Sequence, residues 1–416
     1  MEIRRLPVED IKSFIELVSR SYPGMKVRTE DEIQKMADRF IELQESDKTT
    51  ALYGAYQSEK LVGGMRLHDF EMTFYDQAVP VGGIGMVAVD LLHKKERIAK
   101  RLLEYFHNHY LMQGTYMTAL YPFRPDFYRK MGYGYGAKKN RFRVKPMHLP
   151  KGGSKSHLSY LTVEHADDLT AYYNKTASHT HGLFLRTPSD FERSMKQPGH
   201  IMVGFIENEE IRGYAGFSFH AEPEDSFLQN DIIVHEIMYE NDTVLSELLT
   251  FFHSQQDQVR SIYFDTQDEH FHHLLENPSN GTEQLIPHVF HESNTQGVGV
   301  MYRLLDAKKF LEKVSEHDFN RMTLSLDINL TDTFQPTNHK KFQMNVVEGH
   351  LTTKIVSGKT TEISLDVSDF TSMLMGVVPF DALHTYGRAT ISDKGDVDTV
   401  TKLFHTHKKP ICMTRF

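Results

Sequence analysis

The sequence is poor in cysteine, in long apolar runs and in net positive charge. Cys412 is the single cysteine among 416 residues, so a disulfide within one chain is excluded. No run approaches the ~20 apolar residues that a membrane-spanning helix needs. The opening residues, MEIRRLPVED, lack the apolar core of a signal peptide. We therefore expect a cytoplasmic protein with no membrane partner.

The charge balance argues against nucleic acid as a partner. The chain carries 56 Asp and Glu against 47 Lys and Arg, a formal net charge of −9, whereas a protein that binds nucleic acid needs a basic face. Residues 91–101 reverse this sign, with five basic residues and one acidic residue. A solvated helix face is the ordinary explanation of such a run. A small polyanionic ligand is the functional alternative.

Motifs for metal ions and for common nucleophiles are missing. No Walker loop, nucleophile elbow or zinc-ribbon spacing is present. The histidine clusters at 179–181, 270–273 and 405–407 are typical of solvent-facing histidines on helices or loops. We therefore expect no metal.

Turn residues and apolar periodicity divide the chain into three parts, 1–150, 151–295 and 296–416. PKGGSKSH, from Pro150 to His157, is a linker without apolar periodicity. The first part reads as a helix, a three-strand meander, a helix, a strand, a short helix and a last strand, NRFRVKP. The second part repeats this plan without the basic turn, and the third is a smaller α+β unit. The predicted class is α+β (mixed α/β), and not a doubly wound sheet, because hairpins join the early strands.

Residues 86–103, MVAVDLLHKKERIAKRLL, predict a strand that delivers the chain to the N-terminus of a helix. Unpaired N–H groups and the helix dipole make such a point an anion site. The strand TYMTALYP follows that helix and leads into DFYRKMGY. If the two strands are neighbours and splay after Val89, a ligand with a pyrophosphate and a peptide-like arm can lie along the exposed edge. Coenzyme A has this shape. A buried core tyrosine is the ordinary reading of Tyr128.

These residues carry a resemblance. VAVDLLHKKERIAKRLL resembles motif A of the GNAT N-acetyltransferases, and with FYRKMGY, a second GNAT-like unit and an α+β tail the chain resembles the enhanced-intracellular-survival (Eis) type of bacterial acetyltransferases. The resemblance implies tandem GNAT folds, N-terminal and central, of which only the first binds acetyl-CoA. A C-terminal sterol-carrier-protein-like domain follows. It also implies a homo-oligomer, a hexamer in this family, and a small-molecule amine as the acceptor.

The resemblance assigns the site residues. Tyr128 is implied as the general acid toward the departing thiolate, and the α-carboxylate of Phe416 as the base for the amine. Lys95 to Ala99 are implied to bind the pyrophosphate through backbone N–H groups, and Val87 and Val89 to bind the pantetheine arm. The full set of predicted acetyl-CoA contacts is Val87, Ala88, Val89, Lys94, Lys95, Glu96, Arg97, Ile98, Ala99 and Phe123.

Arg97 departs from the family pattern because it stands where motif A usually has its first glycine. Its side chain either folds into solvent with ordinary helical φ and ψ, or projects over the phosphates as an added cation, or marks a degraded site. Two functions follow from these alternatives. The first is an acetyl-CoA-dependent N-acetyltransferase that acts in a ternary complex on a cationic small molecule, aminoglycoside-like or polyamine-like, or on a lysine. The second is a non-catalytic, coenzyme- or lipid-binding regulatory protein.

Overall fold

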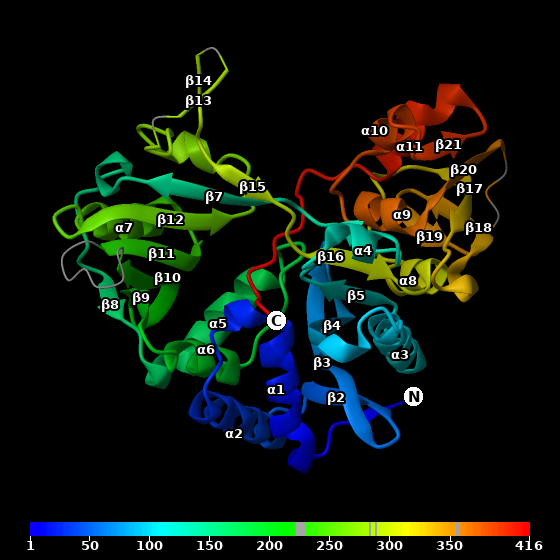
Figure 1. Cartoon of the computed structure of the whole chain (residues 1–416). Helices are drawn as coiled ribbons and strands as arrows, with labels where there is room; N and C mark the ends of the chain where they lie inside the picture. The colour runs from blue at the N-terminus through cyan, green and yellow to red at the C-terminus, as the bar shows by residue number, and fades with distance from the viewer. Residues whose placement is uncertain (222–229, 283, 288, 355, 357) are drawn as a thin grey trace. The chain divides into compact units, whose positions relative to one another are not determined.

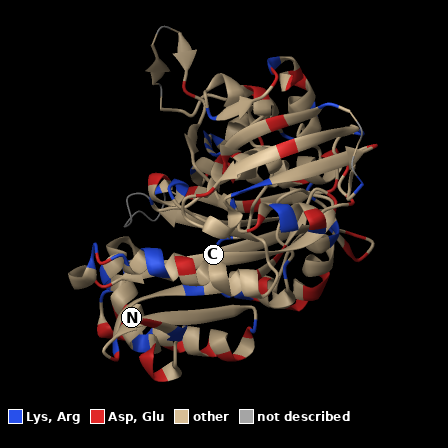
Figure 2. Cartoon of the chain, turned by 90° about the vertical axis from the view of Figure 1, so that its right-hand side faces the viewer, with Lys and Arg blue, Asp and Glu red and all other residues tan. Residues whose placement is uncertain are grey.

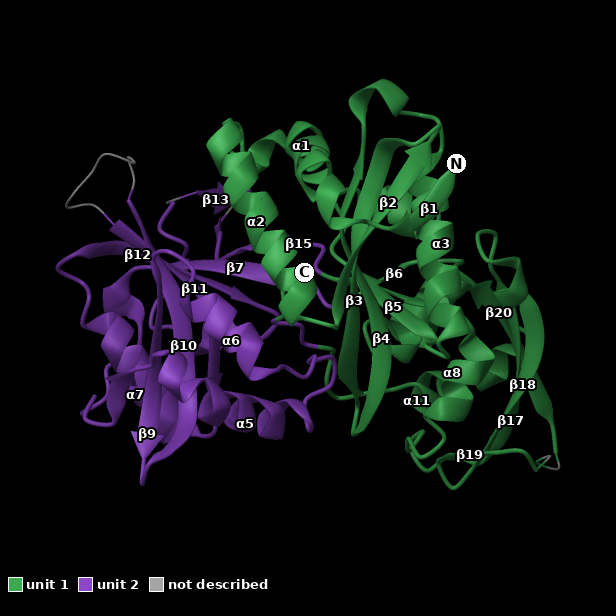
Figure 3. Cartoon of the chain, turned by 90° about the horizontal axis from the view of Figure 1, so that it is seen from below, with its two compact units in different colours: residues 1–136, 300–410, 414–416 green, residues 137–299, 411–413 purple. Residues whose placement is uncertain are grey.

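The computed structural model describes residues 1–221, 230–282, 284–287, 289–354, 356 and 358–416. The chain forms two compact units, coloured separately in Figure 3. Unit 1 contains Met1–Gly136, Val300–Pro410 and Thr414–Phe416, and unit 2 contains Ala137–Gly299 and Ile411–Met413. Two strands that the sequence predicts extend beyond the described residues: IRGYAGFSFHAE ends at residue 222, and HLTTKIVSG contains residues 355 and 357. None of the described helices is long and apolar enough to cross a membrane.

The first sheet of unit 1 has seven strands and contains the predicted meander. Its order is β1-β2-β3-β4-β5-β16-β6, labelled in Figure 1. β2, β3 and β4 pair antiparallel, and β4 pairs parallel with β5, as predicted. The strands are β1 (Glu2–Arg5), β2 (Thr50–Gln57), β3 (Lys60–Phe74), β4 (Gln77–Val89), β5 (Met117–Leu120), β6 (Gly134–Tyr135) and β16 (Met301–Leu304).

Helices cover both faces of this sheet because two separate apolar clusters lie against it. α1 (Ile11–Ser21) buries the apolar stripe of Ile11, Phe14, Ile15 and Val18 on one face. α3 (Ile98–Met112) buries Leu102, Leu103 and Phe106 on the other. α4 (Pro125–Arg129) is the short helix that carries Tyr128. α2 (Glu30–Ser46) packs beside α1.

Two strands lie in a different sheet from the one that the sequence suggested. β7 (Lys139–Val144), which contains most of NRFRVKP, pairs with β12 (Val259–Thr266) and β15 (Thr295–Gly297) in the sheet of unit 2. β16 instead fills the place between β5 and β6 in the first sheet. The prediction of NRFRVKP as the last strand of the first sheet is therefore wrong, because alternation indicates a strand but not its partner. The division of the chain at 150 and 295 stays a prediction.

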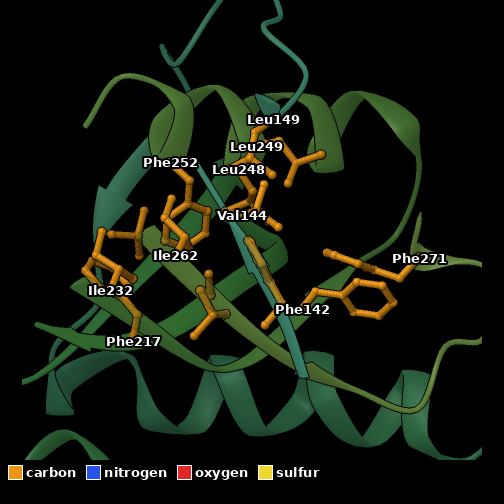
Figure 4. Packing of buried hydrophobic residues seen from close by; sticks show 14 of the residues in the cluster. Phe142, Val144, Leu149, Phe217, Ile232, Leu248, Leu249, Phe252, Ile262 and Phe271 are labelled. Atoms are coloured by element: carbon orange, nitrogen blue, oxygen red, sulfur yellow. The ribbon is translucent and has the colours of Figure 1, made fainter. Parts of the chain in front are cut away.

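Unit 2 repeats the plan of the first sheet, with the order β15-β7-β12-β11-β10-β9-β8. α7 packs on it through the cluster of Figure 4, in which Phe252 and Leu248 of the helix face Phe142 and Ile262 of the strands. Its helices are α5 (Ala166–Ala177), α6 (Pro188–Met195) and α7 (Asp242–His253). Its strands are β8 (Leu158–Tyr160), β9 (His200–Glu207), β10 (Glu210–Ala221), β11 (Asn230–Tyr239), β12 (Val259–Thr266) and β15 (Thr295–Gly297), and β13 (Leu285–Ile286) and β14 (Phe290–His291) form a separate hairpin.

The C-terminal part of unit 1 adds a five-stranded sheet of order β19-β18-β17-β20-β21. α9 is buried along its whole length and packs on β6 and β16 of the first sheet. The strands are β17 (Leu324–Thr331), β18 (Lys340–Val347), β19 (His350–Thr352), β20 (Thr360–Asp366) and β21 (Ala389–Ile391). The helices are α8 (Ala307–Lys313), α9 (Val367–Leu374), α10 (Phe380–Thr385) and α11 (Val397–Leu403).

Short 3₁₀ turns join many of these elements, and charged residues of both signs are interspersed along the ribbon in Figure 2. The turns lie at Val8–Asp10, Pro23–Met25, Leu91–His93, Pro146–His148, Val163–His165, Phe271–Leu274, Pro336–Asn338 and Lys394–Asp396.

Candidate functional site

The site begins where β4 and β5 part. Their parallel ladder ends at the pair Ile84 and Leu120, although β4 continues to Val89. The separation is caused by a β-bulge: the register between β3 and β4 shifts between Gly64 and Arg66, and Met86 has a φ of 50°. The strands therefore separate five residues before Val89, where the sequence had placed the separation. From Gly85 to Val89, β4 remains paired with β3 on one edge, and no described strand pairs with its other edge.

Two carbonyl groups of this open edge are already contacted by side chains. Asp90 N–H donates to Val62 O, on the β3 side. The N–H and C=O groups of successive residues in a strand point to opposite edges. Since Asp90 points toward β3, the backbone groups of Val87 and Val89 point toward the open edge. There the Tyr22 hydroxyl donates to Val87 O at 2.5 Å, and the Ser21 hydroxyl donates to Val89 O at 3.0 Å. Burial raises the pKa of Tyr22, so this hydroxyl is a donor at neutral pH.

The basic turn after β4 takes the backbone conformation that glycine usually supplies. Asp90 caps the Leu91–His93 turn by accepting from Leu92 N–H at 2.9 Å. Lys95 then has a φ of 72°, and Arg97 has φ 63° and ψ 16°, both left-handed. An ordinary helical conformation for Arg97 is therefore wrong. Each left-handed residue of this kind destabilises the folded chain by about 1 kcal/mol relative to glycine. The turn contains two of them.

The turn presents backbone N–H groups and exposed cations together. Arg97 is the N-cap of α3, so the first-turn amides of that helix have no carbonyl partner within it. Ile98 is buried and fixes the helix start on the sheet. Lys94, Lys95, Glu96 and Arg97 have exposed side chains. Glu96 is directed back to His93, at 3.1 Å, which keeps its carboxylate within the turn. The predicted phosphate-binding residues thus lie on one short, strained turn.

Tyr128 lies on α4 with its ring buried. Its ring meets those of Phe123 and Tyr133 edge-on, with centroids 5.8 and 5.9 Å away. Within the described residues its hydroxyl makes no hydrogen bond. Burial, with smaller contributions from Tyr22 and Tyr133, raises the pKa of Tyr128. The phenol is therefore protonated at neutral pH and available as a donor.

Phe416 lies against the bulge of β4. Its ring centroid is 4.9 Å from that of Phe70, 5.8 Å from that of His68 and 5.3 Å from that of Tyr121, which follows β5 directly. Tyr121 also donates from its hydroxyl to Thr414 O at 3.0 Å. The last residues are thus held by β3 and by the residue that follows β5.

The corresponding helix start in unit 2 is closed to an anion. Asn241 caps α7 by accepting from Val244 N–H at 3.1 Å, which uses a first-turn amide. No left-handed residue occurs between the described ends of β11 and α7. Among the described residues, no group of three or more His, Cys, Asp or Glu side chains is arranged to hold a metal ion.

Several residues of the site were not identified from the sequence. Ser21 and Tyr22 come from the end of α1, and Arg66 is the cross-strand partner of Gly85. Sequence carries no signal that brings these residues to β4, because their positions depend on tertiary packing.

Comparisons with known families divide the chain into three matches. Residues 2–136 and residues 182–304 each match a model described as an acetyltransferase (GNAT) domain. Residues 307–413 match a sterol carrier protein domain. A search of curated protein sequences found no match.

Solved structures resemble the whole chain in fold. A GCN5-related N-acetyltransferase from Anabaena variabilis has 16% identity and a TM-score of 0.77, with 100% of both chains covered. A conserved protein from Enterococcus faecalis, described as a probable N-acyltransferase, has 17% identity and a TM-score of 0.78, covering 100% of this chain and 99% of that one. Eis1 from Mycobacterium abscessus has 18% identity and a TM-score of 0.75, with 100% of both chains covered.

Proposed function

Because this chain contains two GNAT acetyltransferase domains and a sterol carrier protein domain, we propose that it is an Eis-type N-acetyltransferase. It transfers the acetyl group of acetyl-CoA to a primary amine of a cationic small molecule, aminoglycoside-like or polyamine-like, or of a lysine, within a ternary complex. The cationic acceptor fits the net charge of −9. In line with the resemblance, the protein works as a homo-oligomer in the cytoplasm.

One observation carries the proposal: the turn after the parted strand β4 has left-handed residues at Lys95 and Arg97. Successive amides in such a turn converge on a concave anion site, and the start of α3 adds its dipole. A degraded loop would have lost this backbone shape with its glycine. The retained conformation therefore favours an intact coenzyme site over the non-catalytic alternative.

The remaining predicted contacts follow the open edge of β4. Val87 and Val89 direct their backbone groups toward the arm of the coenzyme. Their carbonyls already accept from Tyr22 and Ser21, and a carbonyl oxygen has a second acceptor position. Ala88, between them, is buried. Phe123 is exposed beside the ring of Tyr128, where it can cover the thioester end.

Acetyl-CoA supplies the acetyl group and departs as the free thiol. The amine nitrogen forms a bond to the thioester carbonyl carbon, the carbon–sulfur bond breaks, and Tyr128 donates its phenolic proton to the departing sulfur. The α-carboxylate of Phe416 accepts a proton from the amine, directly or through water. Arg66 is in the same neighbourhood, since Arg66 Nη2 and the main-chain carbon of Phe416 lie 3.6 and 3.0 Å from the position of a Cβ on Gly85. A guanidinium there attracts the carboxylate and helps to orient it.

Calorimetry with acetyl-CoA, followed by a thiol-release assay over a panel of amines, tests the function. Micromolar binding with amine-dependent release supports the enzyme, and no binding at millimolar coenzyme would refute it. Tyr128→Phe and a chain extended beyond Phe416 should each lower turnover by about 100-fold with little loss of coenzyme affinity. Full activity of the extended chain would remove the carboxylate from the mechanism.

A further inference from the structure

The short helix that carries Tyr128 is held by charged residues from the C-terminal part of unit 1. α4 has only five residues, and a helix of this length does not hold its own shape in water. Its position therefore depends on what its ends contact. Both ends of the segment from Arg129 to Tyr135 contact residues beyond 300.

The first contact is the Asp369 clamp, which consists of Arg129, Asp369 and Arg388. Arg129 follows Tyr128 directly and forms an ion pair with Asp369 Oδ1. Arg388 donates to Asp369 Oδ2 through Nε at 3.0 Å and Nη2 at 2.7 Å. The carboxylate of Asp369 is 5% exposed and lies on α9. A buried carboxylate shared by two guanidinium groups fixes the end of α4 against that helix.

The second contact holds the turn that follows α4. Arg303 on β16 is fully buried, pairs with Asp332 at 2.6 Å and donates through Nη1 to Met131 O. Gly132, with a φ of 80°, leaves the space that the Arg303 guanidinium fills, and a Cβ there would overlap Nη1. The glycine of FYRKMGY is thus required by an arginine 171 positions later.

The third contact lies past the turn. The hydroxyl of Ser372 on α9 donates to Tyr135 O at 3.0 Å, and a Cβ on Gly134 would overlap the backbone of α9 at Ser368 O. Tyr133, between these points, packs its ring on Tyr128 and bonds to the buried His107 at 2.9 Å. Three contacts within seven residues leave α4 no independent position.

From these contacts we infer that Asp369, in the sterol-carrier-like part of the chain, is a positioning residue for Tyr128. The inference rests on the proposed function for its effect on catalysis, but not for its effect on structure. Asp369 touches neither substrate nor the Tyr128 ring. It acts by fixing Arg129, and through it the direction of the tyrosine hydroxyl. A displacement of about 1 Å in a catalytic group costs up to about 100-fold in rate.

The test uses the full chain with 3-fluorotyrosine at position 128 and the Asp369→Asn variant. The ¹⁹F resonance should shift or broaden, and kcat should fall about 10- to 100-fold while the KM for acetyl-CoA changes less than twofold. Asp369→Glu should restore part of kcat. Asp231→Asn is the matched control, because Asp231 is a buried carboxylate bonded to Arg260 in unit 2.

Two results would overturn the inference: an unchanged ¹⁹F resonance in folded Asp369→Asn, or an equal loss of kcat in the control. If Asp369→Asn does not fold, Arg129→Gln is decisive, since it leaves Asp369 paired with Arg388. A shifted resonance in that variant supports the inference, and an unchanged one refutes it. If the chain proves not to acetylate amines, the ¹⁹F result still decides the positioning role.

Discussion

The main-chain carbon of Phe416 lies 3.0 Å from the position that a Cβ on Gly85 would occupy. Gly85 is the residue of β4 directly before the bulge at Met86. The absence of a side chain there lets the last residue approach the strand where β4 and β5 separate. The proposed base and the proposed thioester-binding edge therefore meet at a single glycine.

Gly85→Ala should move Phe416 by a few tenths of an ångström and lower kcat about tenfold, because the chain end is freer to shift than the strand. Acetyl-CoA affinity and the melting temperature should stay near those of the wild type. Thiol release and calorimetry measure both effects. Gly24→Ala is the control, since nothing in the described part of the chain beyond its two neighbours in sequence lies within 4 Å of its Cβ position. An unchanged kcat in Gly85→Ala would show that Phe416 need not lie this close.

Substitutions at Arg97 separate its charge from its backbone conformation. Arg97→Ala keeps the left-handed strain and removes the cation, so acetyl-CoA should bind about 3- to 10-fold more weakly, the effect of roughly one exposed charge contact. Arg97→Gly removes both, and should be more stable than Arg97→Ala by about 1 kcal/mol at a similar affinity. Calorimetry and thermal unfolding supply the two readouts. Tighter binding by either variant would mean that the guanidinium obstructs the site.

Local pattern in the sequence was enough to predict most elements of both sheets. The stripe from Ile11 to Val18 and the alternation of the meander specify a helix and strands because each buries one face. α2 was missed, since it buries only Ala37 and Phe40. Its one clear signal is the capping box of Thr29 and Glu32, which the structure contains.

Local sequence pattern could not predict which strands pair with each other, nor the backbone conformation of the basic turn. The strands β7 and β16 both have strand character, but which sheet takes each is decided by tertiary pairing. Likewise, Arg97 in a left-handed conformation contradicts its own preference, and the surrounding turn imposes it. Tyr128 and the proposed phosphate turn were predicted through a family resemblance, whereas the positions of Ser21, Tyr22 and Arg66 needed the structure.

Gly132→Ala should destabilise unit 1 by about 3 kcal/mol or more, because it adds a left-handed alanine and displaces the buried Arg303 from its pair with Asp332. Urea unfolding measures the loss. Gly114→Ala isolates the backbone term: its φ is 74°, and the nearest atom, the Tyr116 hydroxyl, is 3.9 Å away. That control should lose only about 1–2 kcal/mol. Equal losses in the two variants would contradict the role of Arg303.

His317 should make unit 1 less stable as the pH falls below neutral. Its ring stacks on Tyr75 at 4.2 Å and meets Phe319 edge-on at 4.6 Å. Burial, with a smaller contribution from His350, lowers the pKa of His317 from 6.5 to about 4, although Asp318 and Asp76 oppose the shift. Between about pH 6.5 and pH 4, His317 is therefore protonated in the unfolded chain but remains neutral in the folded chain.

The His317→Gln variant removes this titration. Between pH 7.5 and pH 4.5 the wild type should lose about 2–3 kcal/mol more stability than the variant, because each pKa unit corresponds to about 1.4 kcal/mol. Urea unfolding of both proteins across this range measures the difference, and the carboxylates that titrate in both cancel. If the free energies of unfolding of the two proteins changed in parallel with pH, His317 would have the same pKa in the folded and the unfolded chain, and its burial among aromatic rings would not disfavour the charged form.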